Sequence, residues 1–231
     1  MVNAPTRTAG QPAGRDLQVG APDPSTFCCV LVAVGAGALF GPFVLAGQVH
    51  APYPLANLFN SPAVWAAAAF AFGVWAQGRM RAAVLGAIVM EVVAVLAYYL
   101  ADVVVRGSDA SIVVSATALA WVVLGVGAGA IFGAAGAAVD HPSSMIRAVG
   151  IALLPAVFLA EAAHQMIRHL TTDADSRPDD LVSTAILLTA LAAAALIWQL
   201  HGRASAERAR TLGVTLALAA VGSVAYAVFA G

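Results

Sequence analysis

Seven long apolar segments, separated by short polar stretches, divide the chain. Charged residues make up only 10% of the 231 residues, whereas 61% are hydrophobic. A soluble domain averages roughly 25% charged and about 45–50% apolar residues, so a globule of this composition could not cover its apolar surface. The pattern excludes a soluble enzyme and predicts an all-α, polytopic transmembrane helix bundle, because helices satisfy their own backbone within lipid.

Most of the apolar segments reach the ~20 residues that a helix needs to cross a bilayer. Residues 62–77 are the exception, because at ~1.5 Å per residue they cover only ~24 Å of a ~30 Å hydrocarbon core. Seven spans are predicted, with six as the alternative. The seven predicted spans are Phe27–Gly47, Pro62–Gln77, Ala82–Val105, Ser111–Val139, Met145–Met166, Leu181–Leu200 and Thr211–Ala230.

The N-terminal residues 1–25 differ from the rest, since they are rich in Gly, Pro, Ala and polar residues. Such a segment cannot bury enough apolar surface to fold, so we expect a disordered cytoplasmic tail there and a transmembrane helical domain over 26–231. The tail is too polar for a secretory signal. Cys28 and Cys29 are adjacent, which makes a disulfide framework unexpected.

All eleven basic residues are arginines, and their placement predicts the orientation of the spans. If residues 62–77 cross the membrane, one side receives Arg7, Arg15, Arg79, Arg81, Arg147, Arg203, Arg208 and Arg210, and the other receives Arg106, Arg168 and Arg177. If they do not cross, this asymmetry disappears. The positive-inside rule therefore favours seven spans in a bacterial cytoplasmic membrane, with the N-terminus cytoplasmic and the C-terminus outside.

Several classes of activity find no support in the sequence. The absence of Lys removes Schiff-base chemistry and the lysine of a Walker A loop, and a net charge of −1 provides no basic face for nucleic acid. There is no HExxH zinc motif or GxSxG elbow, and only His164 lies within a span, whereas a haem needs facing ligands. We therefore expect a protein that is not an enzyme and needs no cofactor or metal.

A polar stripe is predicted on the third span, where Glu91 lies near the membrane midplane. Tyr98 and Asp102 follow at seven and eleven residues, offsets that return to within ~20° of the same direction on a helix. A carboxyl group in lipid is costly, and no basic residue lies deep in any span. Glu91 is therefore expected to be protonated or to face a polar cavity.

A second polar face is predicted on the fifth span. Glu161, His164 and Arg168 are three and seven residues apart, so they share one side of the helix, with Gln165 beside them. The loop after the first span lies on the same side of the membrane. It contributes His50, Tyr53, Asn57, Asn60 and Trp65.

These two faces predict a ligand site that opens outward. Its candidate binding residues are Glu91, Tyr98, Asp102, Glu161 and His164. The alternative is structural pairing, in which Glu161 meets His164 or Arg168 and Asp102 meets Arg106 one turn away.

Small residues recur at four-residue spacing on two spans, which allows helix backbones to approach closely. The fourth span carries Gly125, Gly129 and Gly133, and the first carries Ala33, Gly37 and Gly41. These faces serve either packing within the chain or docking of a membrane partner subunit.

The combined motifs resemble an uncharacterised family of multi-spanning membrane proteins typical of high-GC actinobacteria. The likeness covers roughly residues 27–170 and implies membrane location without an established activity. It rests on Asn60-Ser61-Pro62 with Trp65, Tyr98-Tyr99 with Asp102, Trp121 with Gly125, Gly129, Gly133 and Gly136, and Glu161-Ala162.

A weaker likeness is to the substrate-binding subunits of energy-coupling-factor (ECF) transporters. Those are small bundles rich in Ala and Gly, usually of six spans, with an outward-facing pocket. The likeness implies that Ala33, Gly37 and Gly41 dock on a coupling subunit. Our first hypothesis is accordingly a small-solute binding or transport component, and the alternative is a non-catalytic scaffold or accessory subunit.

Overall fold

The computed structural model describes residues 24–76, 78–171 and 178–229, and within these ranges the chain is helical, without strands. The prediction of an all-α bundle is confirmed. Six helices are long and apolar enough to cross a membrane. They are α1 (Pro24–His50), α4 (Met80–Arg106), α5 (Ala116–Ala137), α6 (Ser144–Thr171), α7 (Pro178–Leu200) and α8 (Ser205–Phe229).

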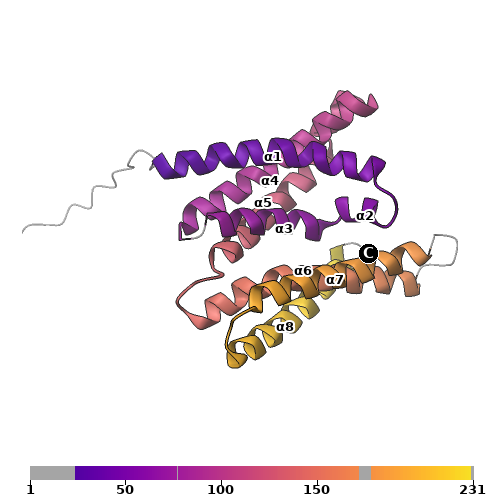
Figure 1. Ribbon diagram of the computed structural model, residues 1–231. Helices are drawn as coiled ribbons and strands as arrows, with labels where there is room; N and C mark the ends of the chain where they lie inside the picture. The colour runs from indigo at the N-terminus through magenta and orange to yellow at the C-terminus, as the bar shows by residue number, and fades with distance from the viewer. Residues whose placement is uncertain (1–23, 77, 172–177, 230–231) are drawn as a thin grey trace, which may run out of the picture.

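Three shorter helices complete the described chain: α2 (Leu55–Phe59), α3 (Pro62–Trp75) and the 3₁₀ helix η1 (Ala110–Val114). Helix α3 has 14 residues, or about 21 Å, so a full membrane crossing by this segment stays a prediction. The chain nevertheless reverses direction at α3 as it does at each long helix (Figure 1). The first residue of α1 and the last residue of α8 consequently lie at opposite ends of the bundle.

The boundaries of two predicted segments need correction. Helix α1 begins at Pro24, inside the predicted tail, and the rest of the tail prediction lies outside the described residues. The predicted span Ser111–Val139 is two elements, because Ser115 ends η1 and starts α5. The Ser115 side chain caps α5 by accepting a hydrogen bond from the Ala118 N–H at 3.1 Å.

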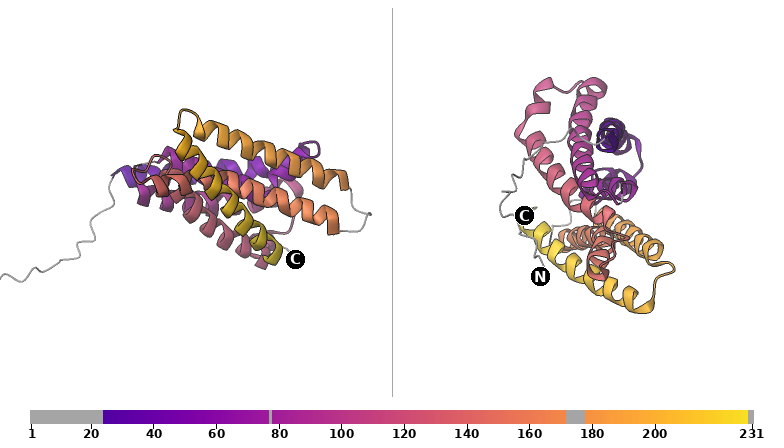
Figure 2. Two further views of the ribbon diagram at one scale, coloured as in Figure 1. Left: turned by 90° about the horizontal axis from the view of Figure 1, so that it is seen from below. Right: turned by 90° about the vertical axis from the view of Figure 1, so that its left-hand side faces the viewer.

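The helices form two groups, which the end-on view separates clearly (Figure 2). In the first group, α4 packs against α1, α3 and α5. In the second group, α6 packs against both α7 and α8. The groups meet where α3 and α5 contact α6, so α6 is the element that joins them.

Glycines permit the close packing around α4. A Cβ atom at Gly129 would lie 2.7 Å from the backbone of Ile88, and one at Gly41 would collide with the backbone of Ala94 and Tyr98. Ala33 and Gly133 are likewise buried against neighbouring helices. The two small-residue faces therefore serve packing within the chain, the first of the two alternatives drawn from the sequence.

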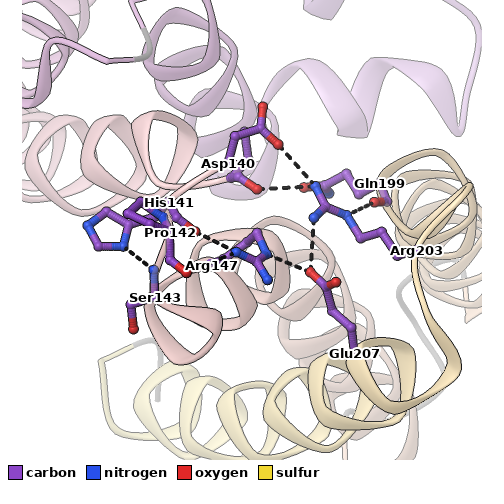
Figure 3. A network of polar contacts seen from close by, with 9 residues as sticks. Asp140, His141, Pro142, Ser143, Arg147, Gln199, Arg203 and Glu207 are labelled. Atoms are coloured by element: carbon purple, nitrogen blue, oxygen red, sulfur yellow. Dashed lines mark hydrogen bonds and ion pairs between the residues drawn. The ribbon is translucent and has the colours of Figure 1, made fainter.

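The arginine-rich end of the bundle is fastened by a polar network (Figure 3). Glu207 of α8 accepts hydrogen bonds from Arg147 Nε at 2.7 Å and from Arg203 Nη1 at 2.9 Å. Arg203 also pairs with Asp140 at 3.3 Å, while Arg147 donates to the His141 carbonyl at 2.6 Å. This network ties the loop before α6 to the turn between α7 and α8.

The outer surface of the bundle is strongly apolar. Val104, Leu170 and Leu39 are each more than three-quarters exposed, and they belong to three different helices. An apolar surface of this extent is stable against lipid and unfavourable in water. The apolar helices thus indicate an integral membrane protein.

Candidate functional site

The N-terminus of α3 is held by a carboxyl group from a distant helix. Ser61 is the N-cap residue of α3, and its side chain makes no capping bond within its own helix. Instead, Glu161 of α6 accepts hydrogen bonds at Oε2 from Ser61 Oγ (2.7 Å) and from the Ala63 N–H (2.9 Å). Glu161 thereby satisfies an amide that the helix leaves free and places negative charge at the positive end of the helix dipole.

Tyr226 of α8 completes this arrangement. Its hydroxyl donates to the same Glu161 Oε2 atom at 3.3 Å, and its ring stacks against the His164 ring at a centroid distance of 5.3 Å. Among the described residues, Glu161 Oε1 receives no hydrogen bond. Helices α3, α6 and α8 therefore converge on one oxygen, and the other oxygen of the same carboxyl is available to a further donor.

A polar pocket of about 410 Å³ lies beside this carboxyl group. We call it the Glu161 pocket. It opens at the end of the bundle opposite the arginine-rich end, since its walls come from the start of α3 and the far halves of α6 and α8. The lining residues are Tyr53, Asn57, Asn60, Pro62, Glu161, His164, Gln165, Arg168, Leu181 and Tyr226.

The segment before α3 forms one wall of the Glu161 pocket through a chain of hydrogen bonds. The Tyr53 hydroxyl donates to Asn57 Oδ1 at 2.8 Å, and Asn57 Nδ2 donates to Thr184 Oγ1 of α7 at 3.1 Å. This wall joins the two helix groups. The predicted meeting of the first loop with the polar face of the fifth span is thus present in the fold.

A second cavity, of about 500 Å³, lies next to the first and is almost entirely apolar. We call it the Glu91 cavity, because Glu91 is the charged residue in its lining. Its walls come from α3, α4, α5, α6 and α8. They include Trp65, Ala66, Val95, Trp121, Leu124, Gly125, Ala128, Phe132, Val157 and Ala225, while Pro62 and Tyr226 line both spaces.

Glu91 has no partner in this setting. The residue is fully buried, and neither of its carboxyl oxygens has a hydrogen-bond partner among the described residues. Helix α5 approaches it closely, since a Cβ at Gly125 would lie 3.3 Å from the Glu91 Cβ. The structure therefore places Glu91 in the wall of an apolar cavity, whereas a polar cavity was one of the two alternatives drawn from the sequence.

The remaining predicted site residues, Tyr98 and Asp102, line neither the Glu161 pocket nor the Glu91 cavity. Tyr98 donates from its hydroxyl to Gln48 Oε1 of α1 at 2.8 Å and lines a separate small space of about 70 Å³. Asp102 forms an ion pair with Arg106 at 3.2 Å and accepts from Ser108 Oγ at 2.7 Å. The structure therefore does not bring the five predicted residues together in one pocket, because successive turns of α4 contact different helices.

Sequence reasoning missed the partners of Glu161. Ser61 precedes a proline at the start of a helix, which is a signal for an N-cap position. Nothing in the sequence indicated that its acceptor would lie 100 residues away. Tyr226 was not among the candidate residues, although it lines both the Glu161 pocket and the Glu91 cavity.

Comparison with known proteins identifies a family and adds no activity. No curated protein and no solved structure matches this chain significantly. A family model, described as a family of unknown function (DUF6518), matches residues 21–231, which is nearly the whole chain. The chain therefore belongs to the DUF6518 family.

Proposed function

We propose that this protein is an integral membrane component that binds a small polar solute in the Glu161 pocket. The observation that supports this most directly is the pocket itself. Its volume of about 410 Å³ lies in the range of small-molecule sites, and polar groups line it within a bundle that is otherwise apolar. Buried polar side chains in a membrane protein are costly unless they pair or bind something.

The chemistry of the lining favours a solute with both an anionic and an amine group. Arg168 provides a guanidinium group, which is suited to a carboxylate or phosphate. Gln165 Oε1 is buried without a hydrogen-bond partner among the described residues. The hydrogen bonds to Glu161 all go to Oε2, so Oε1 is available as a second acceptor. These two acceptors would receive an ammonium group, so a small amino-acid-like zwitterion fits the pocket.

The place of the Glu161 pocket agrees with a role in capture from outside the cell. The positive-inside rule assigns the arginine-rich end, with Arg79, Arg147 and Arg203, to the cytoplasm. The pocket lies toward the other end. The alternative role as a scaffold through glycine faces has less support, because those faces pack against α4.

The proposal is tested by thermal unfolding of the purified protein in detergent, with glycine, glutamate, inorganic phosphate and putrescine as probes. We expect one of the two amino acids to raise the unfolding midpoint by about 5 °C near saturation. Arg168→Gln should abolish this shift. The matched control is Arg106→Gln, which changes an arginine at the same end that lies outside the pocket.

Two outcomes would contradict solute binding at this site. In one, none of the four probes changes the unfolding midpoint. In the other, a shift occurs but survives unchanged in Arg168→Gln, which would place the solute elsewhere.

A further inference from the structure

The Glu91 cavity is distinct from the Glu161 pocket in chemistry and in access. Its lining is apolar and aromatic apart from one carboxyl group, and its exposed lining residues, Leu124 and Ala225, lie on α5 and α8. Leu124 is eight residues from the start of α5, about 12 Å along the helix. The opening is therefore on the side of the bundle, at a depth where lipid surrounds it.

Glu91 forms no ion pair within the part of the chain that the structure describes. On its own helix the basic residues are Arg81 and Arg106, which are ten and fifteen positions away, or about 15 and 22 Å along the axis. Both Glu91 oxygens are without hydrogen-bond partners among the described residues. Packing alone does not account for a carboxyl group here, since an apolar residue would fill the same place at lower cost.

We propose that the Glu91 cavity binds a small lipophilic amine that enters from the membrane. The apolar part of such a molecule would occupy the space of about 500 Å³. Its ammonium group would pair with the Glu91 carboxylate after a rotation of this side chain, because both oxygens are buried in the wall in this structure. Trp65 and Trp121 present aromatic rings in the same walls, which favour a cation through their negative faces. The ligand thereby supplies the partner that the protein lacks.

The cavity should bind molecules of the same shape more weakly when they lack the ammonium group. A neutral alcohol of the same shape would fill the cavity without meeting a charge, and a carboxylate would place a second negative group beside Glu91. Affinity should consequently fall from amine to alcohol to acid. A site that accepted lipid acyl chains by shape alone would show no such order.

The chain offers a spectroscopic readout of this binding. It contains four tryptophans, of which Trp65 and Trp121 line the cavity, whereas Trp75 and Trp198 are more than half exposed. In a Trp75→Phe/Trp198→Phe background, the fluorescence reports on the cavity. The full-length protein in nanodiscs is titrated with 1-aminoadamantane, 1-adamantanol and 1-adamantanecarboxylate.

We expect 1-aminoadamantane to change the emission saturably, with an affinity at least 10-fold higher than that of the alcohol. Glu91→Gln should remove this preference, and Glu91→Asp should retain it. Ala128→Phe, which fills the cavity, should abolish binding of all three probes. Arg168→Gln should leave amine binding unchanged, which separates this site from the Glu161 pocket.

Either of two results would overturn the proposal: equal affinity for the amine and the alcohol, or amine binding that is unchanged by Glu91→Gln. If Glu91→Gln fails to fold, the Ala128→Phe variant and the order of the three probes decide the outcome. A saturable amine response that persists in Ala128→Phe would also refute this location.

Discussion

Glu91 and Glu161 are both buried carboxyl groups in membrane helices, yet their surroundings are opposite. Glu161 Oε2 accepts three hydrogen bonds, two from the N-terminus of α3 and one from α8. Glu91 accepts none from the described residues and faces an apolar cavity. In the sequence both are acidic positions on polar helix faces, although only Glu161 has basic residues close by on its own helix.

The different surroundings distinguish Glu161, which holds helices together, from Glu91, for which we propose a role in binding a ligand. The Glu161 carboxyl is an architectural element, since it connects α3 and α8 to α6 through one oxygen, and its other oxygen receives no hydrogen bond among the described residues. Glu91 contributes no such connection. A group that is costly to bury and does not hold the structure together is best explained by what it binds.

The largest effect should come from removing the Glu161 carboxyl. In Glu161→Leu, the Ser61 hydroxyl, the Ala63 N–H and the Tyr226 hydroxyl lose their acceptor, so the free energy of unfolding should fall by about 3–5 kcal/mol. Denaturant unfolding in detergent measures this change. Glu161→Gln retains an acceptor and should recover more than half of the loss. An unchanged stability in Glu161→Leu would contradict the architectural role.

The corresponding change at Glu91 should have the opposite sign. Glu91→Leu replaces a buried, unpartnered carboxyl by an apolar group, so the free energy of unfolding should rise by about 1–2 kcal/mol. The same unfolding experiment applies, with Glu161→Leu as the contrasting variant. A loss of stability comparable to that of Glu161→Leu would show that the two carboxyls play similar roles.

The smallest effect is expected at Tyr226. Tyr226→Phe removes only the longest of the three hydrogen bonds to Glu161, at 3.3 Å, and keeps the ring beside His164. The free energy of unfolding should fall by about 0.5–1 kcal/mol. Tyr226→Ala serves as the comparison, because it also removes the wall between the two cavities. Equal losses in both variants would mean that the ring contributes nothing.

The helical fold was largely predictable, because hydropathy alone determines which segments enter lipid. The six long helices follow the predicted spans closely, although Ser115 divides the predicted span Ser111–Val139 into η1 and α5. The contacts between helices were harder to predict from the sequence. The spacing of Gly129 and Gly133 indicated close approach, but only the structure shows that α4 is the partner.

The candidate site was predictable as far as it depends on one helix. Glu161, His164 and Arg168 share a face and line one pocket, as their spacing indicated. Tyr98 and Asp102 lie outside this pocket, and their positions depend on which helices surround α4. Arrangement between helices depends on loop paths and packing shapes, which leave little trace in periodicity.

The capping of α3 by Glu161 has a consequence for the biogenesis of the protein. Glu161 follows Ala63 by 98 residues, so α3 is synthesised well before its acceptor. A nascent chain that ends after α5 carries a short helix whose first amides have no Glu161 carboxylate. The cap on α3 can therefore form only after α6 has been synthesised.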